Sequence, residues 1–189
     1  MEDFESLLLN YDFGGEDVER LKSLQPMVEE SIDIFLAIFY GRILTFPHAQ
    51  HFSLHNNIIT KHREKIRLWF LELFHGSYGE AYFEKLKKIS QTHVSIALPP
   101  HYVNLALHIV RSFLHELLIR HQRFDCLKSI NKILDINMDV LNGFYSTTEQ
   151  SNTLQMIHLI YRSFKNNAHG VKLFVQPIFN TQTLHIERY

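Results

Sequence analysis

One stretch of the chain, residues 82–102, most limits what the chain can fold into. It reads YFEKLKKISQTHVSIALPPHY, and its apolar positions recur at spacings of four, three, four and three residues. That spacing places five side chains on one face of a helix. They are Tyr82, Leu86, Ile89, His93 and Ile96. The prolines that follow, Pro99 and Pro100, stop the helix because proline lacks an amide donor and clashes with the preceding turn. The stretch predicts an amphipathic helix with one histidine on its buried face.

The position of His93 leaves two interpretations open. A histidine that faces a core needs a partner for its ring nitrogens, because burying them unpaired costs roughly 1 to 3 kcal/mol. That partner is either a hydrogen-bonding group of the protein or a metal. The residue alone does not decide between them.

The composition narrows the class of protein. The 189 residues suffice for one sizeable core, and 19 Lys and Arg against 20 Asp and Glu leave no net field that would recruit nucleic acid or a membrane. The lone Cys126 gives no disulfide framework, the start MEDFESLLLN is not a secretory signal, and no apolar run approaches the roughly 20 residues needed to span a bilayer. We therefore expect a protein of the reducing cytoplasm that binds neither nucleic acid nor a membrane.

Periodicity and turn residues divide the chain into helices with a short tail. The expected helices cover residues 4–9, 15–24, 26–45, 55–74, 82–96, 102–121, 124–145 and 154–164. The polar segment STTEQSN, residues 146–152, is expected to separate the last two, and two strands are expected within residues 171–189. The fold class is therefore all-α with a short C-terminal extension.

Two of these helices carry more apolar surface than one packing face needs. On residues 102–121 and 124–145 the additional positions are Val110, Leu114, Leu118, Ile133, Ile136 and Val140. A second apolar face suggests a second packing partner, such as another subunit.

A second histidine lies on an apolar stripe of the helix at residues 55–74. His62 is centred between Ile59 and Ile66 at spacings of three and four residues. Long helices that present His62 and His93 suggest a globin-like helical sandwich that clasps haem. Iron in haem takes a neutral imidazole as its proximal ligand, and His93 suits that role. Tyr40 and His62 are the candidate donors to a gas on the opposite side. His62 could instead bind the iron or lie at the rim of the pocket.

Three motifs then carry a resemblance to a known family. They are LKSLQPMVEESIDIFLAIFY, LFHGSYGEAYFEKLKKISQTHVSIALPPHY and KILDINMDVLNGFY, and they lie within about residues 15 to 145. Together they resemble the haem domains of bacterial globin-coupled sensors. The resemblance implies that His93 is the proximal ligand of haem b and Tyr40 the distal tyrosine. The residues expected to contact the cofactor are Tyr40, Phe52, His62, Ile66, Trp69, Ile89, His93 and Tyr102.

The chain departs from that family at three positions. Ala97 replaces the usual glycine after the proximal histidine, and His62 stands where relatives often carry leucine. Lys65 lies near where some relatives place a threonine, so we expect that auxiliary polar contact to be missing.

The tail bears a second, shorter resemblance. FVQPIFNTQTLHIERY is similar to the opening hairpin of EAL-type cyclic-di-GMP phosphodiesterases, and the chain stops where that family's first signature glutamate would follow. The carboxylates that bind the catalytic metals in that family would then be absent, so the chain is not expected to be an enzyme by itself.

These interpretations combine into one expected organisation. Residues 1–146 form a globin-type haem sensor domain, residues 147–170 a linker and signalling helix, and residues 171–189 the start of a truncated output domain. The expected function is sensing of oxygen or another diatomic gas, with regulation of a cyclic-di-GMP phosphodiesterase. By resemblance, a homodimer forms through the helices at 102–121 and 124–145. The alternatives are a free-standing globin that binds oxygen or detoxifies nitric oxide, and a haem-free globin-like interaction module.

Overall fold

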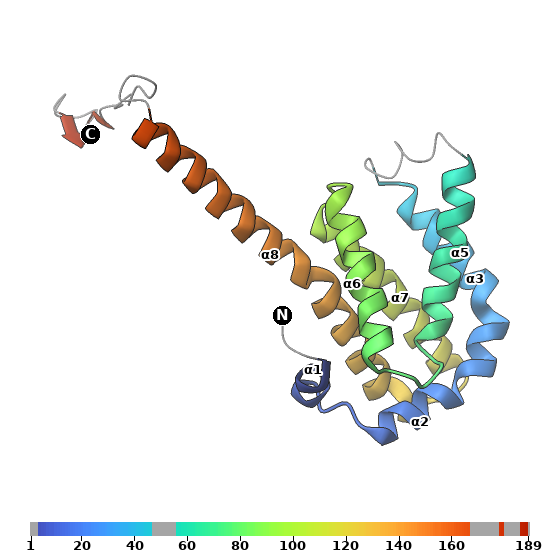
Figure 1. Ribbon diagram of the computed structural model, residues 1–189. Coiled ribbons are helices and arrows are strands. Elements are labelled where there is room, and N and C mark those ends of the chain that lie inside the picture. Colours follow the sequence, from blue (N-terminus) through green and yellow to red (C-terminus); the bar gives the residue numbers. More distant parts are fainter. Residues whose placement is uncertain (1–3, 47–55, 167–177, 180–185, 189) are drawn as a thin grey trace. The chain divides into compact units, whose positions relative to one another are not determined.

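A computed structural model of the chain describes residues 4–46, 56–166, 178–179 and 186–188 (Figure 1). The helices are α1 (Phe4–Asn10), α2 (Gly15–Ser23), α3 (Gln25–Ile43), α5 (Asn56–Glu72), α6 (Glu80–Ser95), α7 (Pro100–Arg120), the short 3-10 helix η1 (Phe124–Cys126) and α8 (Leu127–Asn166). The strands β1 (Ile178–Phe179) and β2 (Ile186–Arg188) pair antiparallel. The predicted helical fold class is confirmed, as is the short strand pair near the end.

The chain divides into two compact units, residues 1–147 and residues 148–189, and α8 contributes to both. None of the helices in the described part of the chain is long and apolar enough to cross a membrane. The first unit contains the core and all of the candidate site residues that the structure describes.

Aromatic side chains form the centre of the first unit. Phe35 of α3 stacks on Phe70 of α5, with ring centroids 3.8 Å apart and planes inclined by 12°. Phe113 of α7 approaches Phe35 with a centroid distance of 5.3 Å. Each such buried ring contributes roughly 1.5 to 3 kcal/mol relative to an exposed one. These contacts hold α3, α5 and α7 together, and Figure 1 shows α3 and α5 side by side.

The apolar residues expected to need a second subunit are instead buried inside one chain. All six are at most 5% exposed, and they are Val110, Leu114, Leu118, Ile133, Ile136 and Val140. The expectation that these residues contact another subunit is wrong. The reason is that α7 and α8 each pack against more than one neighbour of the same chain, so both apolar faces are used internally.

The last long helix does not stop where the polar segment begins. α8 continues through residues 146–152 to Asn166, whereas the composition predicted a break there. Polar residues alone do not end a helix. Residues 144–166 contain neither proline nor glycine, the two residues that terminate helices most strongly.

The C-terminal end of α6 is capped by backbone hydrogen bonds before Pro99 and Pro100. The amide of Leu98 donates to the carbonyl of His93 over 2.9 Å, and the amide of Ala97 donates to the carbonyl of Val94 over 2.9 Å. This pair of bonds is a Schellman cap, in which the residue after the helix is left-handed. Ala97 accordingly has a φ of 52°. The cap fixes the backbone that carries His93. It also leaves Ile96 43% exposed, which corrects the prediction that Ile96 lies on the buried stripe.

A buried carboxylate fastens the start of α2 to α8. Asp17 accepts hydrogen bonds from the hydroxyl of Ser129 over 2.7 Å, from the ammonium of Lys132 over 3.0 Å and from the amide of Gly14 over 3.1 Å. Burial raises the pKa of the Asp17 carboxyl, and these bonds outweigh that effect and lower it below its ordinary value. Asp17 is therefore an ionised anchor between the two helices.

Candidate functional site

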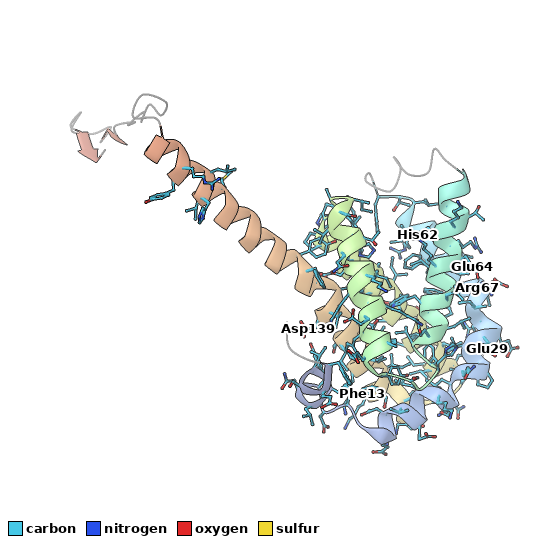
Figure 2. All side chains as sticks on the ribbon, in the orientation of Figure 1. Phe13, Glu29, His62, Glu64, Arg67 and Asp139 are labelled. Carbon is cyan, nitrogen blue, oxygen red and sulfur yellow. The ribbon has the colours of Figure 1, made fainter. Side chains whose placement is uncertain are left out.

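Three of the predicted site residues come from three different helices. Tyr40 lies in the last turn of α3, His62 on α5 and His93 in the last turn of α6. Figure 2 labels His62 on α5. The hydroxyl of Tyr40 lies 2.6 Å from Nδ1 of His62. The fold therefore joins the two residues that the sequence offered as separate candidate donors.

The electrostatics of this pair favour Tyr40 as the donor. Burial raises the pKa of the Tyr40 hydroxyl well above its ordinary value, so the hydroxyl keeps its proton. The Arg63 guanidinium, 5.9 Å from the centroid of the Tyr40 ring, opposes that shift. His62 is exposed over much of its surface, but the surrounding protein desolvates its ring. This desolvation is the main cause of a lowered pKa of His62, and the charge of Lys65 adds to it. A neutral imidazole that accepts at Nδ1 carries its proton on Nε2.

His93 has an unpaired polar atom. Its Nδ1 is buried and has no hydrogen-bond partner among the described residues. Burial, and after it the neighbouring His62, lower the pKa of the His93 imidazole to about 4. The ring is therefore neutral near pH 7, which is the form of histidine that binds a metal.

The remaining predicted contacts that the structure describes lie on α5, α6 and α7. Ile66 and Trp69 on α5, Ile89 on α6 and Tyr102 on α7 are all half-buried. Tyr102 stacks against Phe46, with centroids 5.4 Å apart and planes inclined by 28°. Phe52 lies outside the described residues. The partial burial of Ile66, Trp69, Ile89 and Tyr102 leaves each of these side chains accessible to a flat apolar group such as haem.

The donor set also fits haem better than a bare metal ion. Within residues 4–46 and 56–166 no group of three or more His, Cys, Asp or Glu side chains gathers in a geometry that could hold a metal. Haem iron needs only one axial imidazole from the protein because the porphyrin supplies the other four nitrogens. The neutral imidazole of His93 and the apolar character of the predicted contact residues are together consistent with that cofactor.

Sequence reasoning missed three polar residues near this site. They are Arg63 beside the Tyr40 ring, Ser90 on α6 and Asn137 on α8, the last two fully buried. A signal for Asn137 was present, because it lies midway between Ile133 and Leu141 on the apolar face of its helix. For Arg63 the spacing gave no signal, since it lies on a polar stretch of α5.

Comparisons with known proteins identify the family of the chain. The protoglobin family model matches residues 1–151, which include Tyr40, His62 and His93. Eight solved chains match as well. One is the globin domain of a Geobacter sulfurreducens globin-coupled sensor, which is 32% identical, with a TM-score of 0.72 and coverage of 77% of this chain and 99% of that one. No curated protein matches. Because the family model spans most of the sequence and the solved domain shares the helical fold, this chain belongs to the protoglobin family.

Proposed function

We propose that this chain is a haem-based gas sensor domain, with oxygen as the gas. Membership of a globin family implies that the chain binds haem and a diatomic gas, and the similar solved domain comes from a sensor protein. The carrying observation is the neutral, half-buried imidazole of His93 in the last turn of α6, next to His62 of the Tyr40 and His62 pair. A globin sensor domain is not itself an enzyme.

His93 would be the residue that holds the iron of haem b. Ile66, Trp69, Ile89 and Tyr102, together with Phe52, would line the cofactor. When bound, haem supplies an iron coordination position at which a diatomic gas can be held reversibly. The protein then contributes a dry apolar surface and hydrogen-bond donors whose positions are fixed before the gas arrives.

Tyr40 is the proposed donor to the gas, and His62 the acceptor that competes with the gas for the Tyr40 hydroxyl. A hydroxyl has one proton to donate. While it donates to His62, over the observed 2.6 Å, it is withheld from any other acceptor. In this tautomer Nε2 of His62 carries a proton and cannot bind a metal, which favours a role for His62 as hydrogen-bond acceptor of Tyr40 over direct iron coordination.

The domain organisation extends this proposal. Residues 1–146 would sense the gas, residues 147–170 would pass the signal, and residues 171–189 would begin an output domain. A cyclic-di-GMP phosphodiesterase is the proposed output, supported by the QPI motif and by the antiparallel pairing of β1 with β2. Dimerisation through α7, η1 and the first part of α8 is supported by the family resemblance and by exposed Leu105 and Ile119 of α7 and Phe124 of η1.

The free-standing globin and the haem-free module remain the alternatives. The match of the protoglobin family model to residues 1–151 favours haem binding over the haem-free module, because membership of a globin family implies that the chain binds haem.

Titration of the purified apoprotein with haem tests the proposal. We expect one haem per chain, and we expect His93→Ala to weaken uptake at least tenfold. His108→Ala is the control, because His108 is an exposed histidine of α7 and its removal should leave uptake unchanged. Equal haem affinity in the His93→Ala variant and the unmodified protein would refute the assignment of His93.

A further inference from the structure

Two buried polar residues join α6 to α8 across an otherwise apolar interface. The hydroxyl of Ser90 donates to the backbone carbonyl of Leu141 over 2.6 Å. Asn137 donates through Nδ2 to the hydroxyl oxygen of Tyr82 over 2.7 Å. Both Ser90 and Asn137 are 0% exposed. These contacts are directional, unlike the apolar packing around them.

Asn137 also reaches α5 and its own helix. Its Oδ1 accepts from Nε1 of Trp69 over 3.2 Å, and its Nδ2 donates to the carbonyl of Ile133 over 2.7 Å. One side-chain amide thus uses both donors and one acceptor. Three helices meet at this residue, and none of its polar groups is left unpaired.

The partners of these contacts lie close in sequence to the proposed haem residues. Ser90 precedes His93 by three residues on α6, which is one helical turn. Trp69 follows His62 by seven residues on α5, which is two turns and the same face. Asn137 and Leu141 belong to the helix that continues past residue 147 into the second unit. The contacts therefore connect both histidine-bearing helices to the one helix that the two units share.

Polar contacts in a core suit a two-state coupling. Apolar side chains tolerate small sliding movements, whereas a buried hydrogen bond is lost within a fraction of an ångström and leaves an unpaired group. A shift of α6 or α5 would have to carry α8 along or break these bonds. Coupling between two sites in proteins is typically worth 5- to 150-fold in affinity.

We propose that Ser90 and Asn137 are positioning residues that couple the haem-side helices to α8. The inference rests on the proposed function, because it requires the gas to alter α5 or α6. Gas binding then changes how often the backbone hydrogen bonds of α8 open. The Ser90–Leu141 and Tyr82–Asn137–Trp69 contacts transmit this change. Without these hydroxyl and amide groups, the pocket still binds gas but α8 no longer responds.

Hydrogen exchange of the full chain, loaded with haem and reduced, tests this inference with carbon monoxide as the probe. The quantity measured is the change in amide exchange on adding carbon monoxide within residues 138–147 of α8, divided by the change within α2. The division removes the uniform stabilisation that any bound ligand gives the folded state. We expect a ratio of at least about fivefold in the unmodified protein.

Matched variants separate coupling from stability. Tyr82→Phe and Ser90→Ala each remove one hydroxyl of the contact set, and we expect both to bring the ratio below about twofold while the carbon monoxide spectrum is kept. Tyr78→Phe is the control. Tyr78 is equally buried, at 7% exposure against 3% for Tyr82, but its hydroxyl donates to the carbonyl of Leu73 over 2.6 Å rather than to α8. This variant should keep the full ratio.

The outcomes distinguish the inference from the proposed function. If the unmodified protein binds haem and carbon monoxide but α8 does not respond, the coupling is refuted and the proposed function stands. The coupling is also refuted if Tyr82→Phe and Ser90→Ala keep the full ratio, or if Tyr78→Phe loses it equally. A protein that takes up no haem overturns both.

Discussion

The hydroxyl of Tyr40 and Nδ1 of His62 lie 2.6 Å apart, so a residue of α3 and a residue of α5 share one hydrogen bond. The Tyr40 proton can serve only one strong acceptor at a time. His62 therefore competes with a bound gas for the donor that the gas would use. Substitution of Tyr40 and substitution of His62 are therefore expected to change the rate of gas dissociation in opposite directions.

Variants of this pair test the competition. We expect Tyr40→Phe to speed oxygen dissociation from the haem-loaded protein by about 2- to 13-fold, because a net hydrogen bond is worth about 0.5 to 1.5 kcal/mol. His62→Leu should slow dissociation by a factor in the same range, since the hydroxyl is then released from its competing acceptor. The double variant should behave like Tyr40→Phe. Stopped-flow dissociation rates give the answer, and faster dissociation in His62→Leu would show that His62 itself stabilises the gas.

The left-handed Ala97 at the end of α6 predicts a stabilising substitution. A residue with a Cβ pays about 1 kcal/mol or more in this conformation and glycine does not, so Ala97→Gly should raise the free energy of unfolding by about 1 kcal/mol. The control is Ala106→Gly inside α7, where glycine should instead cost roughly 0.8 to 1 kcal/mol. Urea denaturation of both variants measures the two signs. Destabilisation in both would contradict the cap at Ala97.

The Asp17 anchor predicts a specific dependence of stability on pH. The folded-state pKa of this carboxyl is lowered, so the unfolded chain binds its proton more readily. The stabilisation is then fully present above the ordinary carboxyl pKa and disappears as pH falls through the folded-state value. Asp17→Asn should reduce the free energy of unfolding by about 1 to 3 kcal/mol near pH 7, and by less near pH 3, which lies below the ordinary carboxyl pKa.

Urea denaturation at the two pH values measures that difference. Asp12→Asn is its control, because Asp12 contacts the same Lys132 from a fully exposed position and should change stability by about 0.5 kcal/mol or less. A penalty for Asp17→Asn that is equal at both pH values would show that ionisation of Asp17 does not matter.

The proposed dimer makes a prediction about Ile119 of α7. A charge placed in an apolar interface is costly, so Ile119→Lys should weaken dimerisation at least tenfold in sedimentation velocity runs over a range of concentrations. Ile34→Lys on α3 is closely matched, because both isoleucines are 57% exposed. Equal weakening by the two variants, or a protein that is monomeric at every concentration, would contradict dimerisation through α7.

The sequence predicted those parts of the fold that periodicity determines. The stripe around His93 and the apolar face of α3 set the helices, and the separate motifs for Tyr40 and His93 were enough to expect a haem site. The contact between Tyr40 and His62 could not be derived, because it depends on how closely α3 and α5 pack. Spacing within one helix carries no information about the distance to the next.

Other features were hidden for different physical reasons. An alanine rarely adopts a positive φ, so nothing in the sequence marked Ala97 as a left-handed residue other than its resemblance to a glycine position. The second apolar face of α7 was assigned to another subunit because a sequence does not show how many neighbours a helix has in its own chain. Burial of Val110 and Leu114 inside one chain settled that point.

The visible absorption spectrum of the reduced, haem-loaded protein, recorded with and without oxygen, tests the central claim most directly. The account predicts a haem band that shifts reversibly when oxygen is added, and that is lost or strongly altered in His93→Ala but retained in His108→Ala. A haem band that does not respond to oxygen, or one that His93→Ala leaves unchanged, would contradict a gas-sensing site built on His93.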